Sequence, residues 1–309
     1  MAAPHGSRRG SLQFWPRKRA ARIYPKISYW IGDSIQGFCG YKVGMTTVIT
    51  ISKTGKEIAK SATILEIPPV YTIGSVFYKK EIDRLRKVGV YINFKDIPKD
   101  LKKDLKRKFN YIKESNEDLY KDSVPNHDLI RILVATFPRK IKFKKTPEIF
   151  ELGCDYDFEK ARDLAGKELK IEDYFSDGDF VDVTAITKGK GTQGVIKRYG
   201  VKLRSHDSKK GLRRVGSVGS VTPRKIDWRV PMPGQMGFHQ RTEYNKQILK
   251  ISDKIDEINN KGGFKHYGVV RYKYVLVNGS VPGSRKRLII IRKPKKKRKD
   301  IVQIKEIVN

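Results

Sequence analysis

Runs of apolar and β-branched residues along the chain predict mainly β-strands. The clearest run, residues 40–51, ends at a Lys-Thr-Gly-Lys turn at 53–56. The predicted strands 267–277 and 287–292 flank a turn with glycine and proline at 278–284, as in a hairpin with a wide loop. The other predicted strands are 62–70, 129–136, 179–187, 267–277 and 287–292.

Helical patterns are few. Residues 100–120 carry Leu101, Leu105, Phe109 and Ile112 at helical spacing, and a second helix is predicted at 157–164, capped by Gly166. Strands and helices do not alternate, which disfavours a doubly wound parallel sheet. We therefore expect a mainly β fold, a closed or partly closed β-barrel with a helical insertion around residues 96–128.

The charge adds a functional expectation. The chain has 67 Lys and Arg against 33 Asp and Glu, a formal net charge of +34, which indicates a polyanionic partner. Its longest apolar runs, such as 288–291, are far too short to span a membrane, and no apolar segment follows the basic N-terminus as in an export signal. We expect a cytoplasmic protein without a membrane partner. Cys39 and Cys154, far apart in sequence, are expected to be ordinary buried thiols.

Three stretches hold the basic excess. An extended arm is predicted at residues 1–35. Residues 188–241 carry 14 basic residues against Asp207 and Asp227 and contain nine glycines, so we expect an extension that needs a polyanion to order it. The third stretch, 285–299, has ten basic residues. By contrast, 96–128 is electrically balanced, so the excess is not uniform.

The positions of the basic stretches and of the predicted strands indicate four regions: the arm 1–35, a barrel body of 36–187 with 242–295, the central extension 188–241 and a tail 296–309. Basic, aromatic and amide side chains of the three stretches form the predicted RNA-binding set. Its members are Arg8, Arg9, Arg17, Lys18, Arg19, Arg22, Lys188, Lys190, Lys197, Arg198, Lys202, Arg204, Lys209, Lys210, Arg213, Arg214, Arg224, Lys225, Trp228, Gln235, His239, Gln240, Arg241, Arg285, Lys286 and Arg287.

A glycine motif at 189–194 formally matches the dinucleotide-binding pattern. A dinucleotide site should open a helix with a packed apolar face and reach an acidic residue roughly twenty positions later, and we expect neither after Gly194. Bare glycine backbone flanked by lysines and Arg198 fits close contact with phosphates better.

Other chemistry-bearing residues give weaker signals. His206, Asp207 and Ser208 are consecutive, and neighbours on an extended chain point in opposite directions, so they do not predict a catalytic triad. The five histidines, His5, His127, His206, His239 and His266, show no metal-ligand spacing.

The segment 231–241 combines glycines with Gln235, His239, Gln240 and Arg241, side chains able to bond phosphate, 2′-hydroxyl or base edges; a plain turn between strands is the alternative. Trp15, Trp30 and Trp228 either stack on bases or anchor the core.

Five segments resemble the large-subunit ribosomal protein L-three family, in its archaeal form. They are Gly-Ser-Leu-Gln-Phe-Trp-Pro-Arg-Lys-Arg-Ala at 10–20, Tyr-Lys-Val-Gly-Met-Thr at 41–46, Val-Asp-Val-Thr-Ala-Ile-Thr-Lys-Gly-Lys-Gly at 181–191, Pro-Gly-Gln-Met-Gly at 233–237 and Val-Pro-Gly-Ser-Arg-Lys-Arg at 281–287. The resemblance runs along most of the chain.

This resemblance implies a translation-protein-type β-barrel on the large ribosomal subunit, with the arm and the extension threading through rRNA toward the peptidyl transferase centre. It implies a non-enzymatic, early assembly protein that binds near the 3′ end of the large rRNA, beside ribosomal proteins L-fourteen and an L-twenty-four relative. No cofactor is expected apart from structural Mg²⁺ or K⁺ shared with rRNA. Many relatives carry tryptophan at the tip of the extension, where this chain has Val221, so stacking there is not expected.

Two alternatives stay open. An rRNA-modifying enzyme would share the charge but should add a cofactor loop or a nucleophile in a packed pocket. A general chromatin-type DNA-binding protein should show a compact motif that enters the major groove, whereas these basic residues lie in irregular segments that suit folded RNA.

Overall fold

The protein falls into two compact units in a computed structural model, and each is described separately. Unit 1 comprises Met1–Arg22 and Ile186–Arg241, and unit 2 comprises Ile23–Ala185 and Thr242–Asn309. The predicted domain limits differ from these and stay a prediction. The structure describes residues 9–32, 34–51, 55–109, 115–116, 120, 126–209, 211–222, 224–296 and 303–308.

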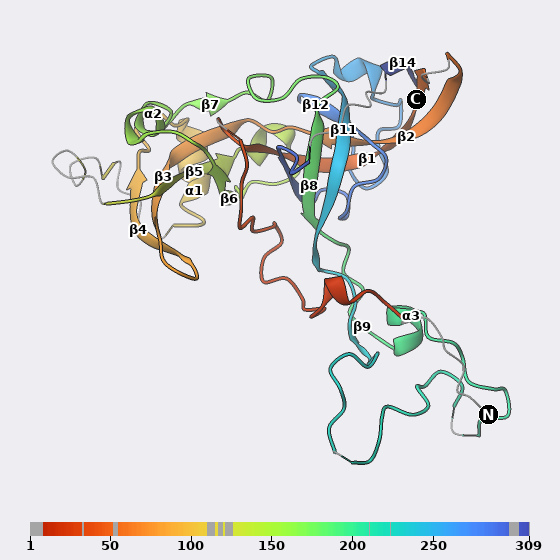
Figure 1. The fold of residues 1–309 in the computed structure, drawn as a ribbon. Coiled ribbons are helices and arrows are strands. Elements are labelled where there is room, and N and C mark those ends of the chain that lie inside the picture. The colour runs from red at the N-terminus through yellow and green to blue at the C-terminus, as the bar shows by residue number, and fades with distance from the viewer. Residues whose placement is uncertain are drawn as a thin grey trace. The chain divides into compact units, whose positions relative to one another are not determined.

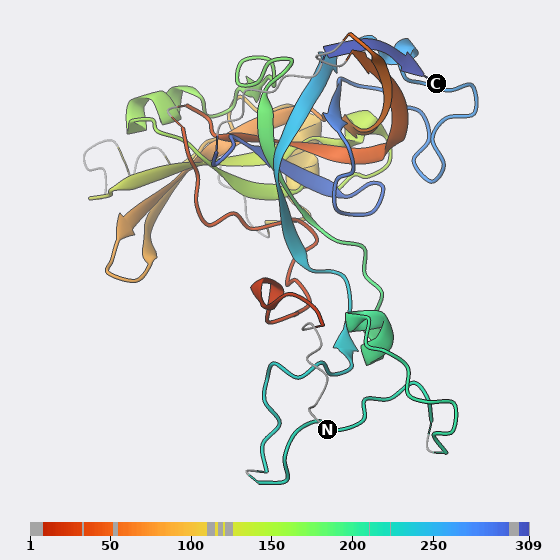
Figure 2. The same cartoon turned by 45° about the vertical axis from the view of Figure 1, so that its right-hand side comes forward.

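Antiparallel strands pair in a closed ring in unit 2. The order is β1, β13, β8, β11, β12, β2 and back to β1, and β14 is added along the far half of β1. Figures 1 and 2 show β8 beside β11 from two sides. The bounds are β1 Gly37–Ile51, β2 Glu57–Glu66, β8 Phe180–Ile186, β11 Gln240–Ser252, β12 Tyr274–Asn278, β13 Leu288–Arg292 and β14 Gln303–Val308. The predicted mainly β fold is confirmed.

Two strands of this ring, β12 and β13, are formed by continuous apolar runs. All five residues of β13 are buried, and so are the first four of β12. A strand covered on both faces needs apolar residues at every position, which explains why these runs do not alternate. Ile289 pairs with Gly40 of β1 and with Ala185 of β8, so β13 is held on both edges.

A second sheet has the order β4, β3, β5, β6, with β7 paired to β3. The short helix α1 (Lys99–Leu105) buries Leu101 and Leu105 in a small core that includes Ile73 and Ala135. The strands are β3 Val70–Lys80, β4 Leu85–Ile92, β5 Leu129–Thr136, β6 Ile149–Gly153 and β7 Glu168–Leu169. The predicted strand 129–136 is confirmed to the residue.

The predicted helix 100–120 is wrong in length. The backbone N–H groups of Arg107 and Lys108 donate to Asp104 and Leu105, three residues back, so α1 ends in a tight turn. Residues 110–114, 117–119 and 121–125 lie outside the described residues, so part of the predicted insertion is not tested. The second predicted helix is confirmed as α2 (Phe158–Asp163), which is followed by Gly166 at φ +92°.

Two strand predictions need correction, and the strand in the tail 296–309 was not predicted. The run 62–70 belongs to two strands, because Pro68 and Pro69 separate β2 from β3. The run 267–277 is a strand only from Tyr274, because the buried carboxylate of Glu66 accepts the backbone N–H groups of Arg271 and Tyr272 at 2.7 and 2.8 Å. The predicted tail contains β14, which pairs with β1.

Unit 1 contains little regular structure. Leu12–Phe14 is a 3-10 helix, and β9 (Thr192–Gln193) pairs with β10 (Gly234–Gln235). The helix α3 (Val195–Tyr199) follows Gly194, so the glycine motif does precede a helix, which sequence analysis did not expect. It has five residues, of which Val195 and Tyr199 are buried.

Candidate nucleic-acid interface

The N-terminal segment and the end of the central extension are bonded together within unit 1. The backbone N–H of Ala20 donates to the Phe238 carbonyl at 2.8 Å, and Nη1 of Arg17 donates to the Arg198 carbonyl at 2.6 Å. Gly237 makes this close packing possible, because it lies at φ +72° and an added Cβ would be 2.1 Å from the carbonyl oxygen of Lys188. Two predicted basic stretches, distant in sequence, are therefore one local structure.

An aromatic cluster supports the basic groups of this structure. The guanidinium groups of Arg17 and Arg198 lie 4.1 and 5.1 Å from the centre of the Tyr199 ring, on which Trp15 stacks at 5.7 Å. Trp228 meets Trp15 edge-on at 5.6 Å and keeps 59% of its surface exposed. Cation–π contacts hold the arginines in place without neutralising their charge.

A cavity of about 340 Å³ lies in the same unit. Five of its lining residues are Lys or Arg and none is Asp or Glu. The lining comprises Arg17, Thr187, Lys188, Lys190, Arg198, Met236, Gly237, His239 and Arg241. A concave surface with charge of one sign concentrates its field, so this cavity is suited to an anion.

The pKa shifts of two groups reflect this environment. Burial lowers the pKa of His239, and the charges of Arg241, Arg17 and Arg198 lower it further, against the raising effect of a bond to the Lys18 carbonyl. Burial, followed by the charge of Arg17, lowers the pKa of Arg241. Its guanidinium lies 4.7 Å from the centre of the Phe14 ring and donates to the Gln240 carbonyl at 2.8 Å.

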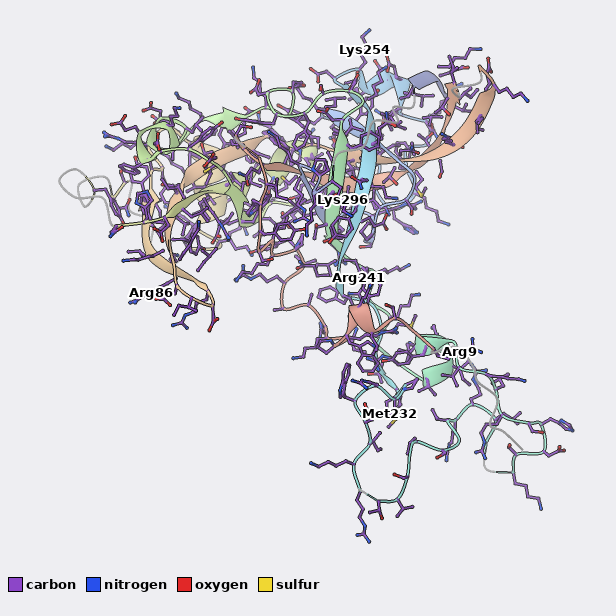
Figure 3. The ribbon with its side chains drawn as sticks, in the orientation of Figure 1. Arg9, Arg86, Met232, Arg241, Lys254 and Lys296 are labelled. Carbon is purple, nitrogen blue, oxygen red and sulfur yellow. The ribbon has the colours of Figure 1, made fainter. Side chains whose placement is uncertain are left out.

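Most predicted residues of unit 1 are exposed, including Lys188 and Lys190 of the cavity. Figure 3 shows side chains projecting from the irregular chain that leads to Met232. The exposed members are Arg9, Lys18, Arg19, Arg22, Lys188, Lys190, Lys197, Lys202, Arg204, Lys209, Arg213, Arg214, Arg224, Lys225, Trp228 and Gln240. Gln235 is half-buried, and its amide donates to the Met236 and Gly237 carbonyls, so it braces the loop. Arg8 and Lys210 lie outside the described residues.

The third basic stretch belongs to unit 2. Arg285 donates to the Lys265 carbonyl at 2.5 Å, Lys286 lies 6.0 Å from the Phe143 ring centre, and Arg287 donates to the Ser284 hydroxyl at 3.2 Å. Arg285 and Lys286 are exposed. The cavity described above is lined by residues of unit 1.

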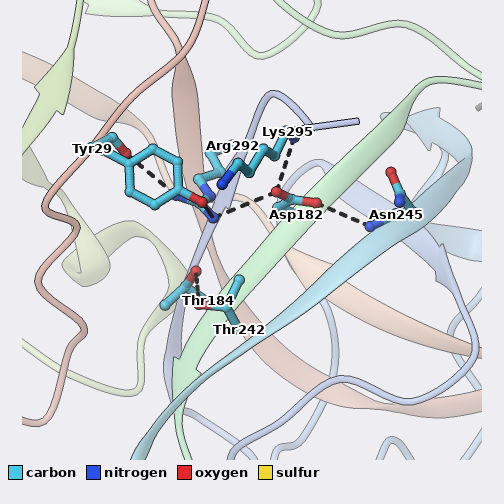
Figure 4. Close-up of polar contacts among 7 residues, drawn as sticks. All are labelled: Tyr29, Asp182, Thr184, Thr242, Asn245, Arg292 and Lys295. Carbon is cyan, nitrogen blue, oxygen red and sulfur yellow. Dashed lines mark hydrogen bonds and ion pairs between the residues drawn. The ribbon is translucent and has the colours of Figure 1, made fainter. Parts of the chain in front are cut away.

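Arg292 of the same stretch has a structural role. It is 5% exposed and pairs with the buried Asp182 at 3.5 Å and with the Tyr29 hydroxyl at 2.9 Å (Figure 4). Asp182 also accepts the backbone N–H groups of Asn245 and Lys295 at 3.0 and 3.1 Å. Counting charge along the sequence therefore overstates the basic surface available here.

Sequence analysis missed the residues that shape the cavity. Thr187, Met236 and Gly237 line it, and Tyr199 and Phe14 support its arginines. Met236 and Gly237 lie within the segment 231–241 considered for RNA contact, and an Arg-Tyr pair next to glycines, at Arg198 and Tyr199, was a further signal. Trp30, one of the three tryptophans considered for base stacking, packs against the core of unit 2.

A family model described as "Ribosomal protein L3" matches residues 1–308. The chain belongs to the ribosomal protein L3 family. The resemblance found from the sequence is thereby confirmed. Among L3 relatives, the large ribosomal subunit protein uL3 of Nanoarchaeum equitans is 46% identical over 315 residues, which cover 98% of this chain and 96% of the relative.

Two other archaeal L3 relatives match over similar lengths. The uL3 protein of Caldivirga maquilingensis is 44% identical and covers 94% of this chain and 90% of its own length. That of Methanopyrus kandleri is 42% identical and covers 94% and 85%. The similarity thus includes the sequences of both units.

Among the described residues, no three His, Cys, Asp or Glu side chains are grouped so that they could hold a metal ion. None of the helices in the described ranges is long and apolar enough to cross a membrane.

Proposed function

We propose that the chain is a structural, non-enzymatic protein of the large ribosomal subunit that binds large-subunit rRNA near its 3′ end and helps to nucleate subunit assembly. Unit 1 is the part that reaches into rRNA, toward the peptidyl transferase centre. Unit 2 supplies a folded body at the subunit surface in the cytoplasm. The large ribosomal subunit proteins L-fourteen and an L-twenty-four relative are the proposed neighbours.

The observation that carries this proposal is the composition of unit 1. Met1–Arg22 and Ile186–Arg241 carry 20 Lys and Arg against 2 Asp and Glu, a net +18. Crowded rRNA phosphates supply the opposite charge, and each Lys or Arg that neutralises a phosphate releases bound counterions. Structural Mg²⁺ or K⁺ shared with the rRNA completes the charge balance in this proposal.

The glycine motif at 189–194 supports a binding role over an enzymatic one. The helix that follows Gly194 has five residues, and Lys190 of the motif lines the cationic cavity together with Lys188, which precedes the motif. A dinucleotide site needs a longer helix packed on a sheet and an acidic group for the ribose. Here, the glycine-rich backbone lets lysine side chains and peptide groups approach phosphates closely.

The experiment compares RNAs of equal length over a salt series. Purified full-length chain is titrated with fragments of large-subunit rRNA, with small-subunit rRNA and with duplex DNA. Preference for the 3′ region of large-subunit rRNA that persists as salt rises supports the proposal. Equal affinity for all three, lost together with salt, means a general basic nucleic-acid-binding protein. Chemical modification of the rRNA by the chain would reveal an enzyme.

A further inference from the structure

His239 differs in chemistry from the other polar groups that line the cavity of unit 1. Its Nδ1 lies 2.7 Å from the carbonyl oxygen of Lys18. A carbonyl only accepts hydrogen bonds, so Nδ1 must carry the hydrogen. The contact therefore fixes one tautomer of the ring.

Burial and the surrounding charges favour the neutral form of the ring. His239 is 7% exposed, and Arg241, Arg17 and Arg198 oppose a further positive charge on it. A neutral ring protonated at Nδ1 keeps a lone pair on Nε2. In the described part of the chain Nε2 has no hydrogen-bond partner, and it is not sealed from solvent. One residue of the lining therefore carries a hydrogen-bond acceptor, alongside five Lys and Arg residues.

A ligand that satisfies this lining must carry an anion and a hydrogen-bond donor close together. The volume of about 340 Å³ is roughly ten times that of a liquid water molecule, enough for more than a bare phosphate oxygen. The RNA backbone offers both groups at every nucleotide, because a 2′-hydroxyl lies next to each internucleotide phosphate. The DNA backbone offers the phosphate alone.

We propose that the cavity holds an internucleotide phosphate of rRNA and that His239 Nε2 accepts a hydrogen bond from the adjacent 2′-hydroxyl. Arg17, Arg198 and Arg241 bind the phosphate, and Lys188 and Lys190 extend the contact along the backbone. His239 makes the site selective for ribose. This inference rests on the proposed rRNA-binding function and specifies that His239 recognises a 2′-hydroxyl group.

Two substitutions of His239 test the contributions of its two ring nitrogens separately. His239→Asn places an amide N–H near the position of Nδ1, which keeps the bond to Lys18 and removes the Nε2 acceptor. His239→Gln reaches the position of Nε2 with a carbonyl oxygen and restores an acceptor. His206→Asn is the matched control, because its side chain lies in the same unit and is 90% exposed.

The probes are a short oligouridylate and its 2′-fluoro counterpart, which keeps the sugar shape but lacks the hydroxyl donor. The unsubstituted chain should prefer the hydroxyl form by about tenfold, the value of one good hydrogen bond. His239→Asn should remove this preference, His239→Gln should restore part of it, and His206→Asn should leave it unchanged. Equal preference in the unsubstituted chain and His239→Asn would overturn the inference.

A site-specific signal guards against binding elsewhere on this basic chain. With the full chain labelled with ¹⁵N in its histidine rings, the Nε2 resonance that His239→Asn removes should shift with oligouridylate and not with the 2′-fluoro probe. An equal shift with both probes contradicts the inference. If rRNA fragments are discriminated as proposed while this signal fails, only the His239 assignment falls. If fragment discrimination itself fails, the proposed function falls.

Discussion

Units 1 and 2 of this chain carry almost the same net charge on very different amounts of protein. Unit 1 has 20 Lys and Arg against 2 Asp and Glu, and unit 2 has 47 against 31. The extensive core of buried residues belongs to unit 2, whereas Val195 and Tyr199 are among the few buried side chains of unit 1. Unit 2 is stabilised by its own apolar contacts, whereas unit 1 has few such contacts to offset the repulsion among its charges, so the proposed polyanionic partner should matter most for unit 1.

The largest difference should appear when apolar side chains are truncated. Ile64 of β2 is fully buried, whereas Leu203 of unit 1 is 48% exposed. Ile64→Ala should lower the free energy of unfolding by about 3 kcal/mol, and Leu203→Ala by about 0.5 kcal/mol or less. Urea unfolding followed by circular dichroism measures both. Equal losses would mean that unit 1 has a core of its own.

The next effect concerns a buried carboxylate of unit 2. Asp104 is fully buried and accepts Nε and Nη2 of Arg139 at 2.7 and 2.6 Å. Asp104→Asn should lower the free energy of unfolding by about 2 kcal/mol. This loss is smaller than that expected when a fully buried ion pair is broken, because Arg139 is partly exposed.

This cost should depend on pH. The bonds from Arg139 hold the pKa of Asp104 below its ordinary value, so its contribution is complete above pH about 4 and is lost as pH falls through the lowered pKa. Urea midpoints of the two chains should therefore converge in acid. A difference that persists at the lowest pH would show that the charge of Asp104 is not its source.

Removal of charge should affect the two units differently. Lys188→Gln with Lys190→Gln removes two exposed cations from the cavity of unit 1. Affinity for the 3′ large-subunit rRNA fragment should fall on the order of tenfold. The slope of log binding constant against log salt concentration should become less steep by roughly 1.5. Lys254→Gln with Lys265→Gln, two exposed lysines of unit 2, is the matched control and should change both less. Equal losses would place the RNA contacts on both units alike.

The smallest effect tests a polar group inside unit 1. The Tyr199 hydroxyl is buried and has no hydrogen-bond partner among the described residues. Tyr199→Phe should leave the stability of the free chain unchanged within about 0.5 kcal/mol, because no bond is lost. Thermal unfolding followed by tryptophan fluorescence in a Trp30→Phe background reports on Trp15 and Trp228, both in unit 1. A marked destabilisation would show that the Tyr199 hydroxyl makes a stabilising hydrogen bond in the free chain, which contradicts this account.

The sequence predicted the elements whose local preference agrees with their surroundings. The run 129–136 is apolar and β-branched, is covered by neighbouring elements, and forms β5 with the predicted bounds. The strand β11 was not predicted. Gln240, Thr242 and Glu243 at its start are polar, and pairing with β8 determines the conformation there.

The candidate interface was predicted as a list of residues but not as a site. The basic stretches can be identified from the sequence alone, and the family resemblance connects them with rRNA binding, which stays a prediction. The contact between Lys18 and His239 joins residues 221 positions apart, and nothing in local spacing predicts it. Arg292 shows the opposite error, because a basic residue within a charged run is buried against Asp182. Such pairings depend on tertiary packing.

Hydrogen exchange of the free chain and of its complex with the 3′ large-subunit rRNA fragment tests the contrast between the units most directly. Peptides from residues 201–232 should exchange rapidly in the free chain and become protected in the complex, while peptides from β12 and β13 should be protected in both. If 201–232 exchanges equally fast with and without rRNA, or if β12 and β13 are protected only in the complex, the assignment of RNA binding to unit 1 and independent folding to unit 2 is wrong.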